Sequence, residues 1–275
     1  MAVNVNGIKI SYGMPAAAVL PLDRAPGGQV PRMASQPSVT SSSPAGLVIL
    51  AYLRTRTEGM RSLDPMVRRD EPDAVHRMRV TTRRLRSTLR SFRHILHREG
   101  TQLLAALDSD RYLSLLDDLD WLLDDPPFTA RAAMPAAEVL PAAARHPWQQ
   151  ADRQMHRARS VAAGQLRDEA LHQARKAARR GRYASEAMAP AVGKEAGRFT
   201  KQMKKVQSVL GEHQDAVITR QVARELGISA HLTGENAFSY GLLYERDVCH
   251  GQRLQVEAQQ AWKRASRPGY LHWMR

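Results

Sequence analysis

The sequence is poor in the residues that build disulfide frameworks, thiolate metal sites and base-stacking surfaces. Cys249 is the only cysteine, so a single chain can form neither an internal disulfide nor a metal site with several thiolates, and a reducing compartment fits this usage. Aromatic residues make up 5% of the chain, which leaves few platforms on which nucleic-acid bases could stack.

Long apolar runs and catalytic signatures are missing as well. The longest apolar run near the N-terminus, Ala45 to Leu53, is too short to span a bilayer and lies too deep, behind a serine-rich stretch, for an ordinary signal peptide. The sequence has no GxxxxGKS/T loop, HExxH helix or GxSxG elbow. We therefore expect a cytoplasmic protein that neither enters a membrane nor carries out nucleophilic or metal catalysis.

Positive charge, in contrast, is abundant and unevenly distributed. The 275 residues, enough for one large or two ordinary domains, include 41 Lys and Arg against 27 Asp and Glu, a formal net charge of +14. The excess is concentrated in two related segments and in Lys194 to Lys205. Such clustering favours an acidic partner: nucleic acid, an anionic membrane surface or a phosphate polymer.

The first basic segment, Ala74 to Arg98, contains eight arginines and no acid. In a helix, five of its basic positions follow one another at i, i+3, i+7, i+10 and i+14 and form a single row. The row consists of His76, Arg79, Arg83, Arg86 and Arg90. Like charges at this spacing repel, so an anion that offsets them is expected.

The same pattern recurs 96 residues later. Leu171 to Met188 aligns without a gap on Val75 to Phe92, with five identities in 18 positions, all of them polar. The repeated residues are His172, Arg175, Arg179, Arg180 and Arg182, the counterparts of His76, Arg79, Arg83, Arg84 and Arg86. An internal duplication is the simplest explanation.

The remaining pattern predicts an all-α domain at residues 44–275 behind a disordered leader, residues 1–43, with at most a strand-like opening at Val3 to Ile10. Helices are expected at Ala45 to about Ser62, about Pro72 to Gly100, Thr101 to Asp125, Ala130 to Gln165 with breaks at Pro135, Pro141 and Pro147, Asp168 to about Ala189, Gly193 to Leu210, Val217 to Leu226, and as a pair at Gly234 to Ala265. His213 and Asp215 then fall in a connection, where they would brace each other or cap the next helix.

Three segments resemble the CHAD domain, the conserved histidine α-helical domain. They are VHRMRVTTRRLRS at Val75 to Ser87, LHQARKAARRGRY at Leu171 to Tyr183, and VQSVLGEHQDAV at Val206 to Val217, and the resemblance extends over about Ala45 to Arg275. It implies a pseudo-two-fold helical bundle whose paired basic helices bind inorganic polyphosphate without catalysis of their own. The family often accompanies a triphosphatase with a Glu-x-Glu-x-Lys signature, which this sequence lacks.

This chain departs from the family pattern in its first half, which lacks about two helices after the first basic helix. A homodimer could complete the shortened bundle. The ligand that the family implies also suggests an association with polyphosphate granules in the cytoplasm.

Evenly spaced guanidinium groups suit a repeating phosphate, since each can pair with it bidentately. The predicted polyphosphate-binding residues are His76, Arg79, Arg83, Arg84, Arg86, Arg90, His172, Arg175, Lys176, Arg179, Arg182, Lys201, Lys204 and Lys205, with Arg84 a weaker candidate because it lies off the row. The two histidines are expected to contact the anion rather than a metal, because cations surround them. No cofactor or metal is predicted.

Two other functions remain open. A nucleic-acid-binding protein could use the same arginines on phosphates alone, without stacking bases. A metal-dependent phosphohydrolase could use the aspartates Asp117, Asp118, Asp120, Asp124 and Asp125, although their irregular spacing among leucines favours a solvated or arginine-pairing helix face.

Overall fold

Long helices dominate the computed structural model, which describes residues 3–5, 8–10, 39–96 and 119–274 and confirms the all-α class. The helical part, within Pro37–Arg275, is one compact unit, and Met1–Gln36 is another. In that second unit, β1 (Val3–Val5) and β2 (Ile8–Ile10) pair antiparallel, with Val3 opposite Ile10, so the strand-like opening is a short hairpin.

The helical unit begins with α1 (Ala45–Arg68) and α2 (Ala74–Ser91), joined by a short turn and packed together. Leu85 and Leu89 of α2, four residues apart on one face of the helix, are fully buried. The helix ends at Ser91, earlier than expected, because Phe92 leaves the helical conformation and turns into the core. Residues 119–124 are helical, whereas the rest of the expected Thr101 to Asp125 helix and the shortening of the first half lie outside the described residues.

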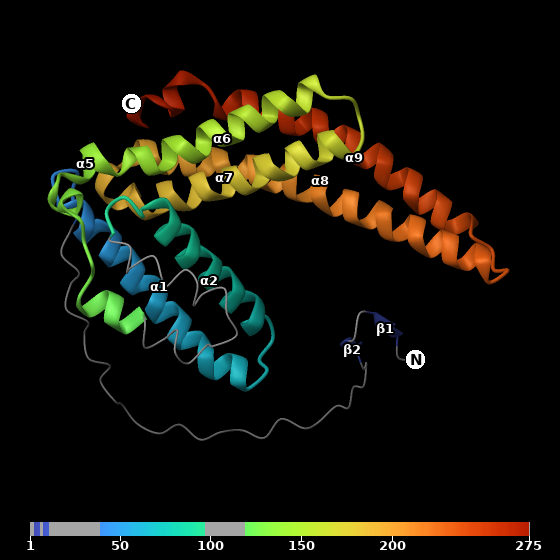
Figure 1. The fold of residues 1–275 in the computed structure, drawn as a ribbon, viewed down its shortest axis with the longest axis horizontal. Helices are drawn as coiled ribbons and strands as arrows, with labels where there is room; N and C mark the ends of the chain where they lie inside the picture. The colour runs from blue at the N-terminus through green and yellow to red at the C-terminus, as the bar shows by residue number, and fades with distance from the viewer. Residues whose placement is uncertain (1–2, 6–7, 11–38, 97–118, 275) are drawn as a thin grey trace, which may run out of the picture. The chain divides into compact units, whose positions relative to one another are not determined.

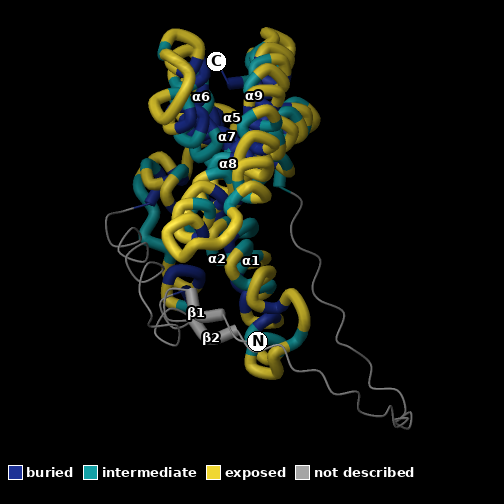
Figure 2. The backbone as a smooth tube through the Cα atoms, turned by 90° about the vertical axis from the view of Figure 1, so that its right-hand side faces the viewer, coloured by how far each residue is buried: buried dark blue, intermediate teal, exposed yellow. Residues whose placement is uncertain are grey.

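Four long helices follow, each packed against the next along the chain (Figure 1). They are α6 (Pro141–Ser160), α7 (Gln165–Val192), α8 (Lys194–Leu232) and α9 (Phe238–Ala265), preceded by the short η1 (Ala130–Ala133) and α5 (Ala136–Val139) and followed by η2 (Pro268–Tyr270) and η3 (His272–Met274). Small and aliphatic side chains fill the core between them, and dark segments in Figure 2 mark these buried positions.

Several expected helix boundaries are wrong. The predicted break at Gly211 does not occur, because that residue lies inside α8, an unbroken helix of 39 residues. Pro147 lies inside α6 rather than ending a helix, and the predicted pair at the C-terminus is the single helix α9. The connection expected around His213 therefore does not exist, and His213 lies on the buried side of α8.

The second basic helix, α7, contacts α1, α2, α6 and α8. It is thus the central helix of the described unit, since the α1–α2 pair packs on it from one direction and the α6 and α8 helices from others (Figure 1). The two copies of the repeat, α2 and α7, touch each other directly.

Candidate anion-binding site

The contact between α2 and α7 brings parts of the two basic rows together. The pKa of Arg179 on α7 is lowered, mainly by burial and then by the nearby charge of Arg83 on α2. Burial likewise lowers the pKa of Arg180, with a contribution from Arg90 on α2. Guanidinium groups from both copies therefore share a partly buried region in which their charges repel one another.

Arg175 and Arg182 extend this region along α7. The Arg182 guanidinium carbon lies 4.6 Å from the centroid of the Tyr183 ring, a cation–π contact. Arg175 lies over the backbone of α8, where its Nη2 is 3.5 Å from the position that a Cβ on Gly211 would occupy. The Nε atoms of both arginines are buried and have no hydrogen-bond acceptor among the described residues. Buried donors without acceptors are costly, which leaves these two guanidinium groups only partly satisfied within the described residues.

Arg84 has a different environment from the row. Its Nη1 donates to Glu186 Oε1 at 2.7 Å, and Arg56 of α1 donates to the same oxygen at 3.1 Å. Glu186 occupies the position in the second copy that Arg90 occupies in the first. This Arg56–Glu186–Arg84 cluster joins α1, α2 and α7, and its acid already neutralises part of the charge of Arg84.

Arg56 and Glu186 were not among the residues predicted from the sequence. The sequence does contain an indication of Glu186, because this acid stands at i+14 from His172, at the end of the basic row of α7. An acid at the end of an otherwise basic row indicates a partner from another helix, although it does not say which helix.

The other predicted residues lie around this region or away from it. His76, Arg79 and Arg90 are exposed on α2, Arg86 is half-buried there, and Lys176 is half-buried on α7. His76 lines a pocket of 390 Å³ with Arg56, Arg77 and Arg84, so cations surround it. Lys201, Lys204 and Lys205 are exposed on α8, and no contact described for them reaches the Arg83–Arg179 pair.

His172 does not share the surroundings of His76. It lines a pocket between α7 and α8 that contains acids and bases together, including Glu169, Glu225 and Arg224, and no described residue of α2. The repeat therefore places its two histidines in unlike environments, which its sequence identity did not indicate.

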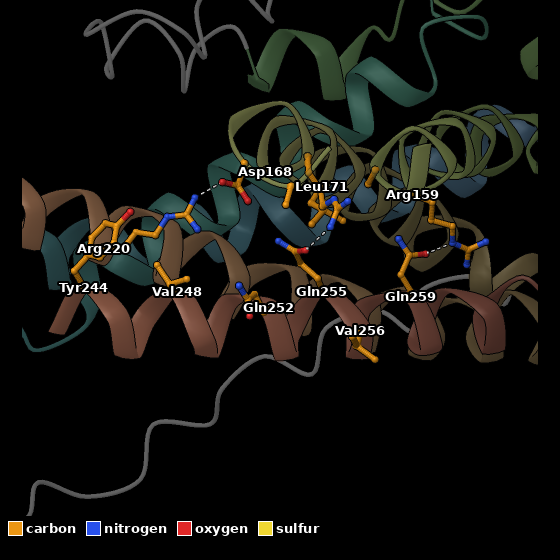
Figure 3. Close-up of a pocket in the computed structure, with 14 residues that line it drawn as sticks. Arg159, Asp168, Leu171, Arg220, Tyr244, Val248, Gln252, Gln255, Val256 and Gln259 are labelled. Atoms are coloured by element: carbon orange, nitrogen blue, oxygen red, sulfur yellow. Dashed lines mark hydrogen bonds and ion pairs between the residues drawn. The ribbon is translucent and has the colours of Figure 1, made fainter. Parts of the chain in front are cut away.

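A polar cluster that the sequence did not reveal lies at the start of α7. Asp168 is buried and forms an ion pair with Arg220 of α8 (Figure 3). Its Oδ1 lies 3.4 Å from His213 Nε2. The His213 Nε2 is also 3.2 Å from Gln255 Nε2 of α9. These residues join three helices beside a cleft of 710 Å³. Asp215, the partner expected for His213, is exposed instead.

The pKa of His213 is lowered, although an acid lies beside it. Burial is the largest cause; Asp168 acts in the opposite direction, and Arg220 adds to the lowering. Burial prevails because the charge of Arg220, which pairs with Asp168, offsets part of the attraction between the carboxylate and an imidazolium. We therefore regard the His213–Asp168 contact as one that involves a neutral imidazole.

The aspartates proposed for a metal site are dispersed. Asp120 forms an ion pair with Arg61, Asp124 and Asp125 are exposed, and Asp117 and Asp118 lie outside the described residues. Within the part of the chain that the structure describes, no three His, Cys, Asp or Glu side chains are grouped so that they could hold a metal ion. In the same residues, no helix is both long and apolar enough to cross a membrane.

Comparisons with known proteins agree with this fold. The family model "CHAD domain" matches residues 51–104 and 97–224. The uncharacterized proteins Rv2226 and MT2285, from two strains of Mycobacterium tuberculosis, are each 37% identical over 157 residues, which are 56% of this chain and 29% of theirs. The match thus spans less than a third of these relatives. The solved structure of PptA from Streptomyces chartreusis has a TM-score of 0.61 at 18% identity, over 80% of this chain and 100% of that one.

Proposed function

The chain belongs to the CHAD domain family, and we propose that it binds linear inorganic polyphosphate, without catalysis, through the basic faces of α2 and α7. The observation that carries the proposal is the shared guanidinium region of the two repeat copies. The charge of Arg83 lowers the pKa of Arg179 there, and Arg175 and Arg182 keep buried donors without acceptors among the described residues.

A linear polyphosphate matches this region in charge and in its repeated hydrogen-bond acceptors. It carries a negative charge at every phosphate and exposes oxygen acceptors along its whole length, so neighbouring guanidinium groups can bind successive phosphates. Binding would relieve the repulsion between the two rows. The exposed lysines of α8 would add attraction without fixed geometry.

Nucleic acid is a weaker fit to the same region. Sequence-independent binding of single strands relies on aromatic faces that stack on bases. Tyr52 and Tyr183 are the aromatic residues described in this region, and guanidinium groups of Arg56, Arg84 and Arg182 lie over their rings. Because guanidinium groups occupy these ring faces, the rings offer little surface for stacking bases, and a polyanion without bases fits the region better.

A competition experiment tests the proposal. Long-chain polyphosphate, duplex DNA and single-stranded RNA are titrated at two salt concentrations, and affinity is compared at matched charge. We expect the tightest binding for polyphosphate and a steep loss of affinity with salt, by analogy with counterion release from nucleic acids. Equal affinity for all three polymers would sink specific polyphosphate binding.

Two arginine-to-glutamine substitutions, which remove the same charge at different places, provide a matched pair of variants. Arg83→Gln removes an exposed member of the shared region, and Arg153→Gln removes an exposed arginine of α6. The first should weaken polyphosphate binding about tenfold or more, the value of one or two charge-assisted hydrogen bonds. The second should change it little. Similar losses in both variants would mean that net charge alone drives binding.

Catalysis and location are tested separately. Incubation of polyphosphate with the protein and added magnesium should release no phosphate, whereas release would support the phosphohydrolase alternative. We also expect a cytoplasmic protein that gathers on polyphosphate granules, which fluorescence microscopy of the tagged full chain can check.

A further inference from the structure

The outer part of the α8–α9 hairpin has no partner among the described residues. On the inner part, α7 packs against α8. However, α6 ends at Ser160 and α7 begins at Gln165, whereas α8 and α9 continue to their turn at residues 233–237 (Figure 1). Most residues of this outer part are exposed, and Figure 2 views the hairpin from that end.

An apolar groove runs between the two helices in this outer part. It has a volume of 530 Å³, and the residues that line it include the small Ala223, Gly227 and Gly241. Its walls include Ile228, 50% exposed, and Leu232, 80% exposed. These side chains leave aliphatic surface exposed to solvent at the groove, and burial of that surface by a partner would be favourable.

The groove continues a packing face that is already used within the chain. Ile228, Arg224 and Tyr244 line both the groove and the pocket beside the first turn of α7. The face that α7 covers on the inner part is therefore left uncovered on the outer part. A pair of helices laid on it would extend the same layer of helix packing.

We propose that a second copy of this chain covers the groove, so that two α8–α9 hairpins related by a two-fold axis form a four-helix bundle. A two-fold contact requires a surface that complements itself. The groove meets this requirement, because each hairpin offers both small residues and protruding Ile228 and Leu232 side chains. This inference does not rest on the proposed ligand.

Charges of both signs lie beside the groove. Arg224 lines the groove, and Glu225 precedes Ile228 and Leu232 by three and seven residues, on the same face of α8. On α9, Glu245 follows Gly241 by four residues and is exposed. Rotation of one copy can thus place acids against bases, whereas the strongly basic α2–α7 region would repel itself.

The oligomeric state tests the proposal. The mass of the full chain is measured by sedimentation over a wide range of protein concentration, and we expect it to rise from one copy to two. The variant Ile228→Asp should weaken dimerisation about a hundredfold or more, because a two-fold contact buries the new carboxylate twice without a partner.

A control on the opposite side of the same helix distinguishes the groove from a general effect. Leu226 is 48% exposed and lies two residues before Ile228, so the two side chains point about 160° apart. Leu226→Asp should leave dimerisation unchanged. Circular dichroism of both variants checks that α8 remains helical.

Three results would overturn the proposal. A wild-type chain that stays monomeric at every concentration excludes the second copy as the occupant. An Ile228→Asp chain that dimerises as the wild type does moves the interface elsewhere. Equal losses in Ile228→Asp and Leu226→Asp exclude the groove as the specific contact.

Discussion

At the scale of single residues, the ion pairs of Glu186 distinguish two kinds of arginine. Those that pair with Glu186 stabilise the contact between helices, whereas those without an acid partner can bind an anion. Glu186 accepts hydrogen bonds from Arg84 and Arg56 on two other helices, and all three side chains are about a quarter exposed, with 24%, 25% and 28% for Glu186, Arg84 and Arg56. Arg84 is therefore a positioning residue, whereas Arg83, its neighbour in sequence, is exposed and has no ion pair described.

A double-mutant cycle measures this distinction. Arg84→Gln and Glu186→Gln should each lower the free energy of unfolding by about 1–3 kcal/mol, because each leaves a partly buried partner unsatisfied. The double variant should lose less than the sum of the two. Denaturant titrations give these values, and polyphosphate affinity should fall less in Arg84→Gln than in Arg83→Gln. Additive losses would show that Arg84 and Glu186 do not stabilise the fold through each other.

His213 makes stability depend on pH. Burial lowers its pKa below the ordinary value of 6.5, and burial also lowers the pKa of His94. The unfolded chain therefore binds protons that the folded chain does not. The stabilisation is complete above pH 6.5 and is lost as the pH falls below it toward the folded pKa.

Thermal denaturation tests the direction of this pH dependence. The midpoint is measured at a series of pH values from about 7.5 downward, on both sides of the ordinary histidine pKa. The midpoint of the wild type should fall on acidification, and His213→Gln should show a shallower fall. His156→Gln is the control, since His156 is exposed on α6. A wild-type midpoint that rises on acidification would contradict the prediction.

At the scale of helices, a close approach of Phe128 to α1 requires glycine at position 46. A Cβ there would lie 2.9 Å from the Phe128 ring and 3.0 Å from the Cβ of Ala132. Gly46→Ala should lower the free energy of unfolding by about 1–3 kcal/mol through overpacking, even though alanine favours helices.

Gly197, in α8, provides the comparison, because no atom lies within 4 Å of a Cβ added there. Gly197→Ala should stabilise the protein by about 0.5–1 kcal/mol from helix propensity alone. Denaturant unfolding of both variants gives the values. A destabilised Gly197→Ala or an unaffected Gly46→Ala would refute this account of the two sites.

The sequence was sufficient to predict the helices and the duplication, because periodic apolar and basic residues act within one helix. It was insufficient at Pro147 and Gly211, where packing overrides a local breaker signal: Pro147 is buried in α6, and Gly211 gives space to Arg175. The Arg83–Arg179 approach and the Glu186 cluster depend on how α2 crosses α7. No spacing within one helix determines such a contact.

At the scale of the whole molecule, an excess of 14 positive charges with a shared arginine region should make stability sensitive to the type of anion. Tripolyphosphate should raise the denaturation midpoint more than chloride at equal ionic strength. A ligand present at a hundred times its dissociation constant stabilises the folded state by about 2.7 kcal/mol. Calorimetry of the wild type and of an Arg83→Gln, Arg179→Gln double variant checks this.

Tripolyphosphate should raise the denaturation midpoint of the double variant less than that of the wild type, while chloride should affect both midpoints alike. An undiminished gain in the double variant would place the anion at another surface. The same comparison with sulfate separates a preference for a chain of phosphates from a preference for any multivalent anion.

The unbroken α8 has a consequence for the length of polymer that two copies could share. Its 39 residues form a rod of about 58 Å, with Lys201, Lys204 and Lys205 toward one end and the groove at the other. In the proposed two-fold pair, the rods hold the two basic surfaces at opposite ends of the particle. A short oligophosphate could then occupy only one surface, and only a chain long enough to follow both rods could engage both. The length of α8 would thus set the shortest polyphosphate that can bind both surfaces at once.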